Sequence, residues 1–140
     1  MNLFSLGRAV LLIALLSLSL SSNVLAASPH INYLLYCTGC HAVDGSGKPP
    51  NVPSLRHELG RMISVPEMRS YLVRIPGASQ APISDADLTD VINWLLHEFN
   101  SDTLPPNFEE YSLEEVSSAR QNILADPLKY RAEHWKAYDK

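Results

Sequence analysis

Five consecutive residues, Cys37-Thr38-Gly39-Cys40-His41, carry the clearest chemical signal of this 140-residue chain. They place two thiols three positions apart, with an imidazole directly after the second thiol. Cys37 and Cys40 are the only cysteines in the chain, so this motif contains all of its thiols. Upstream, the pair Ser28-Pro29 looks like a helix N-cap followed by proline at the first helical position. Apolar residues at helical spacing then predict a short amphipathic helix that ends at the motif: Ile31, Leu34 and Leu35.

A Cys-x-x-Cys-His motif is the attachment signature of a c-type haem. The two cysteines would form thioether bonds to the haem vinyl groups, and the short link between them would hold the next side chain beneath the iron. Cys37 and Cys40 are therefore predicted to bind one haem c covalently, and His41 is predicted to be the proximal iron ligand. The second ring nitrogen of His41 would be held by a hydrogen-bond acceptor.

A redox-active dithiol is the rival interpretation of Cys-x-x-Cys. A thioredoxin-type motif follows a strand and opens a helix within a βαβ pattern. In this chain a helix is predicted before the motif, and no alternating strand pattern occurs nearby. The sequence therefore favours haem attachment over dithiol chemistry.

The first 26 residues have the pattern of a secretory signal peptide. A single charge, Arg8, precedes an apolar or small run over residues 9–20, and Val24-Leu25-Ala26 offers a signal-peptidase site. A retained membrane anchor is the alternative, but this run of about 12 residues is short of the roughly 20 needed to span a bilayer. Because haem is attached to such motifs outside the bacterial cytoplasm, we expect a periplasmic protein that is cleaved after Ala26 and has no stable membrane insertion.

The 114 residues after Ala26 are enough for one domain, whose small core would benefit from a buried cofactor. Ten basic against fifteen acidic side chains give this part a formal charge of −5. Residues 27–75 carry +2 and residues 76–140 carry −7. The scattered basic residues do not form the concentrated face that nucleic-acid binding requires. Ordinary solvated surface is the simpler interpretation, and a mildly basic rim that steers an acidic redox partner is the alternative.

Helix signals recur along the rest of the chain. A turn-rich loop follows the motif, and the next well-marked helix is expected to begin at Pro66 and to stop at Pro76-Gly77. A capping-box-like start at Ser84 opens the clearest helix, and Ser112 and Asp126-Pro127 predict two more. The apolar stripe of the clearest helix comprises Leu88, Val91, Ile92, Leu95, Leu96 and Phe99, with Trp94 close enough to its edge to pack on the first helix.

These signals predict an all-α protein in three parts. They are a signal peptide (1–26), a domain of three to five short helices around one haem (27–103) and a C-terminal helical extension (104–140). The extension is interpreted mainly as an appendage packed against the haem domain, and a partner-binding arm is the alternative. Its expected apolar face comprises Leu113, Val116, Ile123 and Leu124.

The order of these features resembles that of class I c-type cytochromes, which are small haem proteins that carry electrons. The resemblance covers roughly residues 28–99 and implies a cytochrome c fold in which the first and last helices cross near the haem. It also implies that the carbonyl of Pro53 accepts a hydrogen bond from His41. The matching segments are the first helix, the motif, Asp44-Gly45-Ser46-Gly47, Pro53-Ser54-Leu55 and the Ile83-Ser84-Asp85-Ala86-Asp87-Leu88 start of the last core helix.

The sixth iron ligand departs from the family pattern. Such cytochromes usually place a methionine, often followed by proline, a few residues before the last helix, where this chain has Ala81-Pro82. Met62 is the first replacement candidate and Met68 the second, although methionines ordinarily fill gaps in a core. His57 is a third candidate, although a surface position is the more ordinary one for it. An open sixth position is the alternative.

Together these features predict an electron-transfer protein rather than an enzyme. It would pass single electrons from a dehydrogenase-type donor to a respiratory acceptor, such as a terminal oxidase or another cytochrome. One alternative is a haem module that binds or senses a small ligand at an open sixth position. Another is a cytochrome subunit that its tail holds in a larger oxidoreductase complex. A peroxidase-like enzyme is disfavoured, because the sequence offers no distal His/Arg pair.

Overall fold

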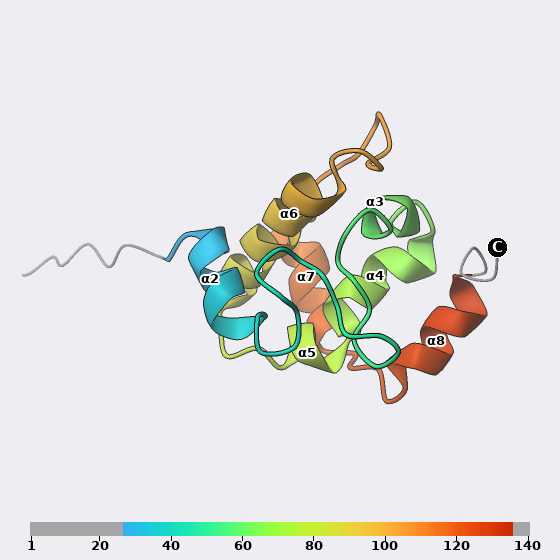
Figure 1. The fold of residues 1–140 in the computed structure, drawn as a ribbon, viewed down its shortest axis with the longest axis horizontal. Helices are drawn as coiled ribbons and strands as arrows, with labels where there is room; N and C mark the ends of the chain where they lie inside the picture. The colour runs from blue at the N-terminus through green and yellow to red at the C-terminus, as the bar shows by residue number, and fades with distance from the viewer. Residues whose placement is uncertain (1–26, 136–140) are drawn as a thin grey trace, which may run out of the picture.

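The computed structural model describes residues 27–135, and this part of the chain is all-α, as predicted (Figure 1). The β-type pairing in these residues is an isolated antiparallel bridge between Lys48 and Val52. The predicted signal peptide lies outside the described residues. Within residues 27–135, no helix is both long enough and apolar enough to cross a membrane. The helices are α2 (Pro29–Tyr36), α3 (Leu59–Met62), α4 (Pro66–Arg74), α5 (Pro76–Ser79), α6 (Asp85–Asn100), α7 (Leu113–Arg120) and α8 (Pro127–His134).

Four predicted helix starts are confirmed by their caps. The hydroxyls of Ser28, Ser84 and Ser112 each accept a hydrogen bond from the backbone N–H three residues later, and the Asp126 carboxylate does the same. Each cap gives a partner to one of the N–H groups that a helix start would otherwise leave unpaired. Proline in the first turn of α2, α4 and α8 has no N–H to satisfy and a φ angle that suits the helix.

The end of α4 is as predicted, but the chain then turns into another short helix. Ile75 is extended, with ψ of 141°, because the residue before a proline is disfavoured in the helical region. Pro76 then takes the first position of α5, where its ring is again compatible with a helix. The prolines therefore stop one helix and begin the next, instead of leading into a plain loop.

The buried face of α2 differs in part from the predicted one, although Leu34 packs against the core as expected. Tyr33 is fully buried, whereas Ile31 and Leu35, which were expected to face the core, are 45% and 64% exposed. The Tyr33 ring packs on two rings of α6, with centroid distances of 5.3 Å to Trp94 and 5.5 Å to Phe99. Successive side chains of an α-helix are rotated by about 100° around its axis. Residues two positions away from Tyr33 are therefore rotated by about 200° and point to the opposite side of the helix. A large aromatic ring therefore decides the orientation of α2.

Helices α2 and α6 pack against each other, and the Cys-x-x-Cys-His motif follows directly from α2 (Figure 1). The predicted packing of Trp94 on the first helix is confirmed by its contacts with both Tyr33 and His30. The crossing places the motif beside the apolar stripe of α6.

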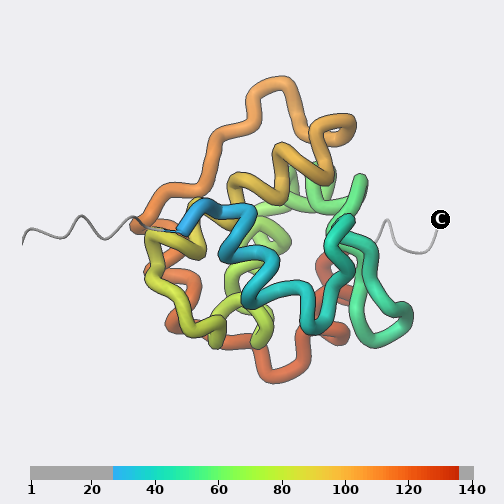
Figure 2. Tube along the Cα trace, turned by 60° about the vertical axis from the view of Figure 1, so that its left-hand side comes forward, coloured from blue at the N-terminus to red at the C-terminus, as the bar shows by residue number. Residues whose placement is uncertain are grey.

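The C-terminal extension packs against the preceding helices and shares their core. Helix α7 packs against α4 and α6, and α8 packs against α4. Figure 2 shows the segment between α6 and α7 doubling back, so that the two last helices lie against the body of the protein. The extension adds four residues to the hydrophobic cluster that also contains Tyr33: Tyr111, Val116, Leu124 and Trp135. Two residues of its expected apolar face, Leu113 and Ile123, are about half exposed instead.

Candidate functional site

The Cys-x-x-Cys-His motif forms a tight turn at the end of α2. The backbone N–H groups of Cys40 and His41 both donate to the carbonyl of Cys37, at 3.2 and 3.0 Å. The Thr38 hydroxyl donates to the carbonyl of Leu34 at 2.7 Å. These bonds bring the two thiols and the imidazole, which sequence reasoning singled out, into one compact unit.

The loop that follows the motif is held between α2 and α6. The Tyr33 hydroxyl donates to the carbonyl of Ala42 at 2.6 Å, and burial is the main cause that raises the pKa of Tyr33 to about 12, so the donor keeps its proton. Gly45 has φ of +79°, and a Cβ atom at this position would lie 2.8 Å from the Phe99 ring. Glycine is therefore required here by both conformation and space.

A buried amide fastens the next segment of the site. The Asn100 side chain has no exposed surface; it donates to the carbonyl of Leu55 at 2.8 Å and accepts from the N–H of Gly60 at 3.3 Å. Leu55 and Leu59 belong to this segment and line the cavity described below. Sequence reasoning missed Asn100, because its partners are 45 and 40 residues away and nothing in the local pattern connects them.

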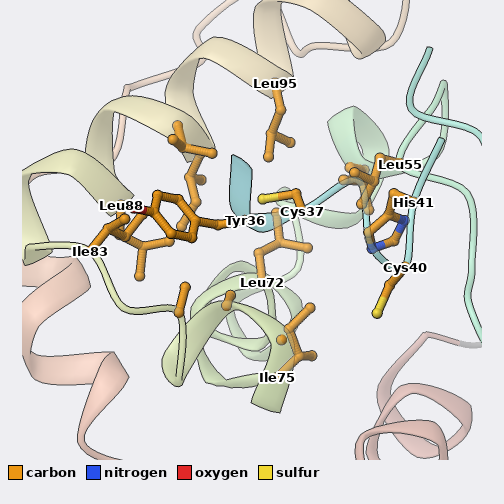
Figure 3. A pocket seen from close by; sticks show the side chains of 16 residues that line it. Tyr36, Cys37, Cys40, His41, Leu55, Leu72, Ile75, Ile83, Leu88 and Leu95 are labelled. Atoms are coloured by element: carbon orange, nitrogen blue, oxygen red, sulfur yellow. The ribbon is translucent and has the colours of Figure 1, made fainter. Parts of the chain in front are cut away.

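A largely apolar cavity lies beside the motif, and Cys37, Cys40 and His41 are part of its wall (Figure 3). The cavity is open to solvent, and its empty space with the open mouth included is about 740 Å³. In Figure 3 the sulfur of Cys37 points into the middle of this space. The remaining lining residues are Tyr36, Leu55, Leu59, Leu72, Ile75, Gly77, Ala78, Ala81, Ile83, Leu88, Val91, Ile92 and Leu95.

A second cavity shares Cys40 and His41 with the first, so the imidazole borders both. Helix α8 closes it with Leu128 and the buried Arg131. The Arg131 guanidinium forms an ion pair with Glu58, which also accepts a hydrogen bond from the indole of the C-terminal extension's Trp135 at 2.7 Å. The extension therefore supplies part of the wall on this side, which sequence reasoning did not foresee.

The His41 imidazole is arranged to be neutral. Burial lowers the pKa of His41, which keeps the ring in the unprotonated form that binds metals. Its Nδ1 atom is buried and has no hydrogen-bond partner in the structure. The implied hydrogen bond from His41 to the Pro53 carbonyl is therefore absent. That carbonyl instead lies against Gly47, where an added Cβ atom would be only 2.6 Å from its oxygen.

The Cys37 thiol does not have the environment of a reactive cysteine. Both cysteines are free, and the pKa of Cys37 is raised to about 11, chiefly by burial and further by the neighbouring Cys40. Redox-active cysteines instead have a lowered pKa, which makes the thiolate available at neutral pH. The structure gives the dithiol interpretation no support.

None of the three predicted candidates for the sixth ligand lines the cavity. Met62 and Met68 are fully buried in the hydrophobic core, and neither is among the residues that line either cavity. His57 is exposed, and its Nδ1 atom lies 2.9 Å from a carboxylate oxygen of Asp102. Ala81, at the position where the family usually has methionine, does line the cavity.

No protein family, curated protein or solved structure matches the chain. Within residues 27–135, no group of three or more His, Cys, Asp or Glu side chains is placed to hold a metal ion by itself. The donor set of the cavity nevertheless suits haem, because a porphyrin supplies four nitrogen ligands and needs only an axial imidazole from the protein. Two free thiols, a neutral imidazole with an orphaned buried nitrogen, and apolar walls fit that group.

Proposed function

We propose that this protein is an exported, monohaem c-type cytochrome that carries single electrons and has the class I fold. The observation that supports this proposal best is the meeting of Cys37, Cys40 and His41 at the wall of one apolar cavity. In the proposal, the two cysteines hold the haem through thioether bonds, and His41 is the proximal ligand. The site has no proposed catalytic acid, base or nucleophile.

The haem would supply the redox chemistry by cycling its iron between Fe(II) and Fe(III). The chain's own residues would hold the group and control its surroundings. The hydrocarbon side chains of α4 and α6 exclude water, and such low polarity is one of the features by which a protein sets a haem's reduction potential. The two covalent links would prevent loss of the group from so small a domain.

Electrons would enter and leave at the side where the motif meets solvent. Cys40 is exposed, so the edge of a group attached to it lies at the surface, within reach of a docked partner. The proposed partners are redox proteins: a dehydrogenase-type donor and a respiratory acceptor, in the periplasm. Membership of a larger oxidoreductase complex is compatible with the same site.

A second candidate function is the binding of a small uncharged ligand at the sixth position of the iron. The observation that favours it is the position of Met62, Met68 and His57, because none of the three lines the cavity. The walls around Ala81 offer hydrocarbon instead of a sulfur or nitrogen donor. An apolar pocket of this kind would favour neutral diatomic molecules over anions, which are costly to bury without partners.

A redox titration of the purified full chain tests the proposed function. The expected result is one reversible one-electron transition with the absorption spectrum of a covalently bound haem in both states. A chain that shows no such transition is not the proposed carrier. Carbon monoxide added to the reduced protein separates the two candidates: an unchanged spectrum favours a closed carrier, and a rapid, complete shift favours the ligand-binding function.

A further inference from the structure

Arg120, at the end of α7, reaches the segment 79–83, which we call the cavity loop. Its guanidinium donates to three backbone carbonyls of this loop: those of Ser79 at 2.8 Å, Ile83 at 2.9 Å and Ala81. It also donates to the carboxylate of Asp85 at 2.7 Å, the first residue of α6. One side chain of the C-terminal extension therefore joins the loop, α6 and α7.

The cavity loop is part of the wall that would face the haem. Ala81 and Ile83 both line the cavity, and Figure 3 shows Ile83 at the far end of it from His41. The N–H groups of the loop bond within the segment 75–83, whereas the carbonyls of Ser79 and Ile83 accept from Arg120. A guanidinium that satisfies three of its carbonyls at once fixes the backbone on which these apolar side chains are carried.

Burial and a neighbouring carboxylate strengthen the hydrogen bonds that Arg120 donates to the cavity loop. Its side chain is only 16% exposed, so its bonds are little weakened by competing water. The carboxylate of Asp85 balances the charge. Hydrogen bonds from Arg120 first, and from Ser117 second, hold the pKa of Asp85 below its usual range, so this carboxylate stays charged near neutral pH.

We propose that Arg120 is a positioning residue that keeps the cavity loop in place as a closed, apolar wall of the haem cavity. The C-terminal extension would thereby control how readily a small molecule enters the cavity and reaches the iron. This role rests on the proposed function for the identity of the bound group. The hydrogen bonds between Arg120 and the cavity loop involve only residues of this chain, so they can be tested separately.

Arg69 provides a matched control for Arg120. It also connects α7 to the core, through a two-pronged ion pair with Glu115 at 2.6 and 2.9 Å. The central carbon of its guanidinium lies 4.0 Å from the centroid of the Tyr111 ring, in a cation–π contact. The guanidinium also donates to the carbonyls of Glu109 and Glu110. None of these recorded contacts involves the cavity loop. Loss of Arg69 should therefore loosen the extension without releasing the loop directly.

The first readout is backbone hydrogen exchange in the full chain. The amides of Ser79, Gln80, Ala81 and Ile83 are all hydrogen-bonded within the segment 75–83, so their exchange reports whether the loop opens. Arg120→Gln is expected to speed their exchange at least about tenfold, because it removes several charge-assisted bonds at once. Arg69→Gln is expected to leave the ratio of loop exchange to exchange in the centre of α6 unchanged.

The second readout is the rate at which imidazole, an added haem ligand, binds the oxidised haem-loaded protein. Faster binding is expected for Arg120→Gln, an intermediate rate for Arg120→Lys, and the wild-type rate for Arg69→Gln. Arg120→Lys keeps the charge but presents a compact ammonium in place of the planar fork. Unfolding temperatures measured in parallel would show whether the variants with altered rates are still folded.

Two results would overturn the positioning role. One is wild-type exchange in the loop of folded Arg120→Gln; the other is equal acceleration by Arg69→Gln, which would indicate general loosening. If Arg120→Gln does not fold, Arg120→Lys and Asp85→Asn decide by the same criteria. A chain without covalent haem would contradict the proposed function, whereas unchanged loop exchange would contradict only the role of Arg120.

Discussion

The candidate site has two sides, the Cys-x-x-Cys-His motif and the wall at Ala81, and single residues account for the chemistry of only the first. On one side, Cys37, Cys40 and His41 have chemistry that their order in the sequence already indicates. On the other side, the wall at Ala81 is hydrocarbon, and its position depends on Arg120. A short linear motif can specify three adjacent side chains, but a wall assembled from distant segments has no such signature.

Ala81 is the residue at which the wall can be changed most simply. We expect Ala81→Met to place a thioether in the cavity and so to fill the sixth position of the haem iron. A sulfur ligand should raise the reduction potential and weaken carbon monoxide binding to the reduced protein. Both quantities can be measured on the same sample. Ala78→Met, which changes another residue of the cavity wall, is the comparison, and equal effects of the two substitutions would argue against a specific position for the ligand.

Asn100 is a buried polar residue whose removal should lower the stability of the fold. Asn100→Ala would leave the carbonyl of Leu55 and the N–H of Gly60 buried without this partner. We expect the free energy of unfolding to fall by about 3 kcal/mol, since an unsatisfied buried group costs roughly 1–3 kcal/mol. Denaturant unfolding measures the change. Asn107→Ala, at an exposed position, should alter it by no more than about 0.5 kcal/mol, and equal losses would contradict the importance of the buried amide.

The helices show why some predictions from sequence hold and others do not. Ser28, Ser84 and Ser112 are confirmed as caps, because capping depends on residues only three positions apart. The buried face of α2 was predicted only in part: Leu34 packs against the core, but Ile31 and Leu35 are exposed, and Tyr33 is the buried residue that packs on α6. Burial depends on the partner helix, and a single helix does not contain that information.

The junction of α6 and α7 gives a pH prediction. The depressed pKa of Asp85 means that its bond to Arg120 stabilises the fold fully at pH values above the unfolded pKa of about 3.9. That contribution is lost as the pH falls through this value toward the lower folded pKa. Asp85→Asn should therefore destabilise the protein at pH 7 and lose its effect in acid, as followed by unfolding curves at both pH values. Asp90→Asn, at an exposed position of the same helix, is the control; an Asp85→Asn deficit that does not shrink in acid would contradict the linkage.

At the scale of the whole molecule, the extension belongs to the fold. Val116 and Trp135 pack in the same cluster as Tyr33, and Arg74 accepts the N–H of Leu124 through its carbonyl at 3.0 Å. The sequence predicted that residues 104–140 pack against the helical domain. It did not reveal that their arginines reach the cavity wall, because such contacts depend on how the chain doubles back after α6 (Figure 2).

Truncation tests this integration. A chain that ends at Thr103 would expose the apolar surface that α7 and α8 cover, and we expect it to lose cooperative thermal unfolding. A chain that ends at Trp135 keeps every described residue and should unfold cooperatively, near the wild-type temperature. Circular dichroism during heating distinguishes the two outcomes. Wild-type cooperativity in the shorter chain would show that the extension is a separate appendage.

The central claim is that Cys37 and Cys40 hold one haem covalently. The most direct measurement is the mass of the protein after expression of the full chain in a bacterium that has haem c maturation machinery. The wild-type protein should carry the added mass of one haem after denaturation, and the Cys37→Ala, Cys40→Ala double variant should carry none. A wild-type chain without added mass, or a double variant that retains it, would contradict the account.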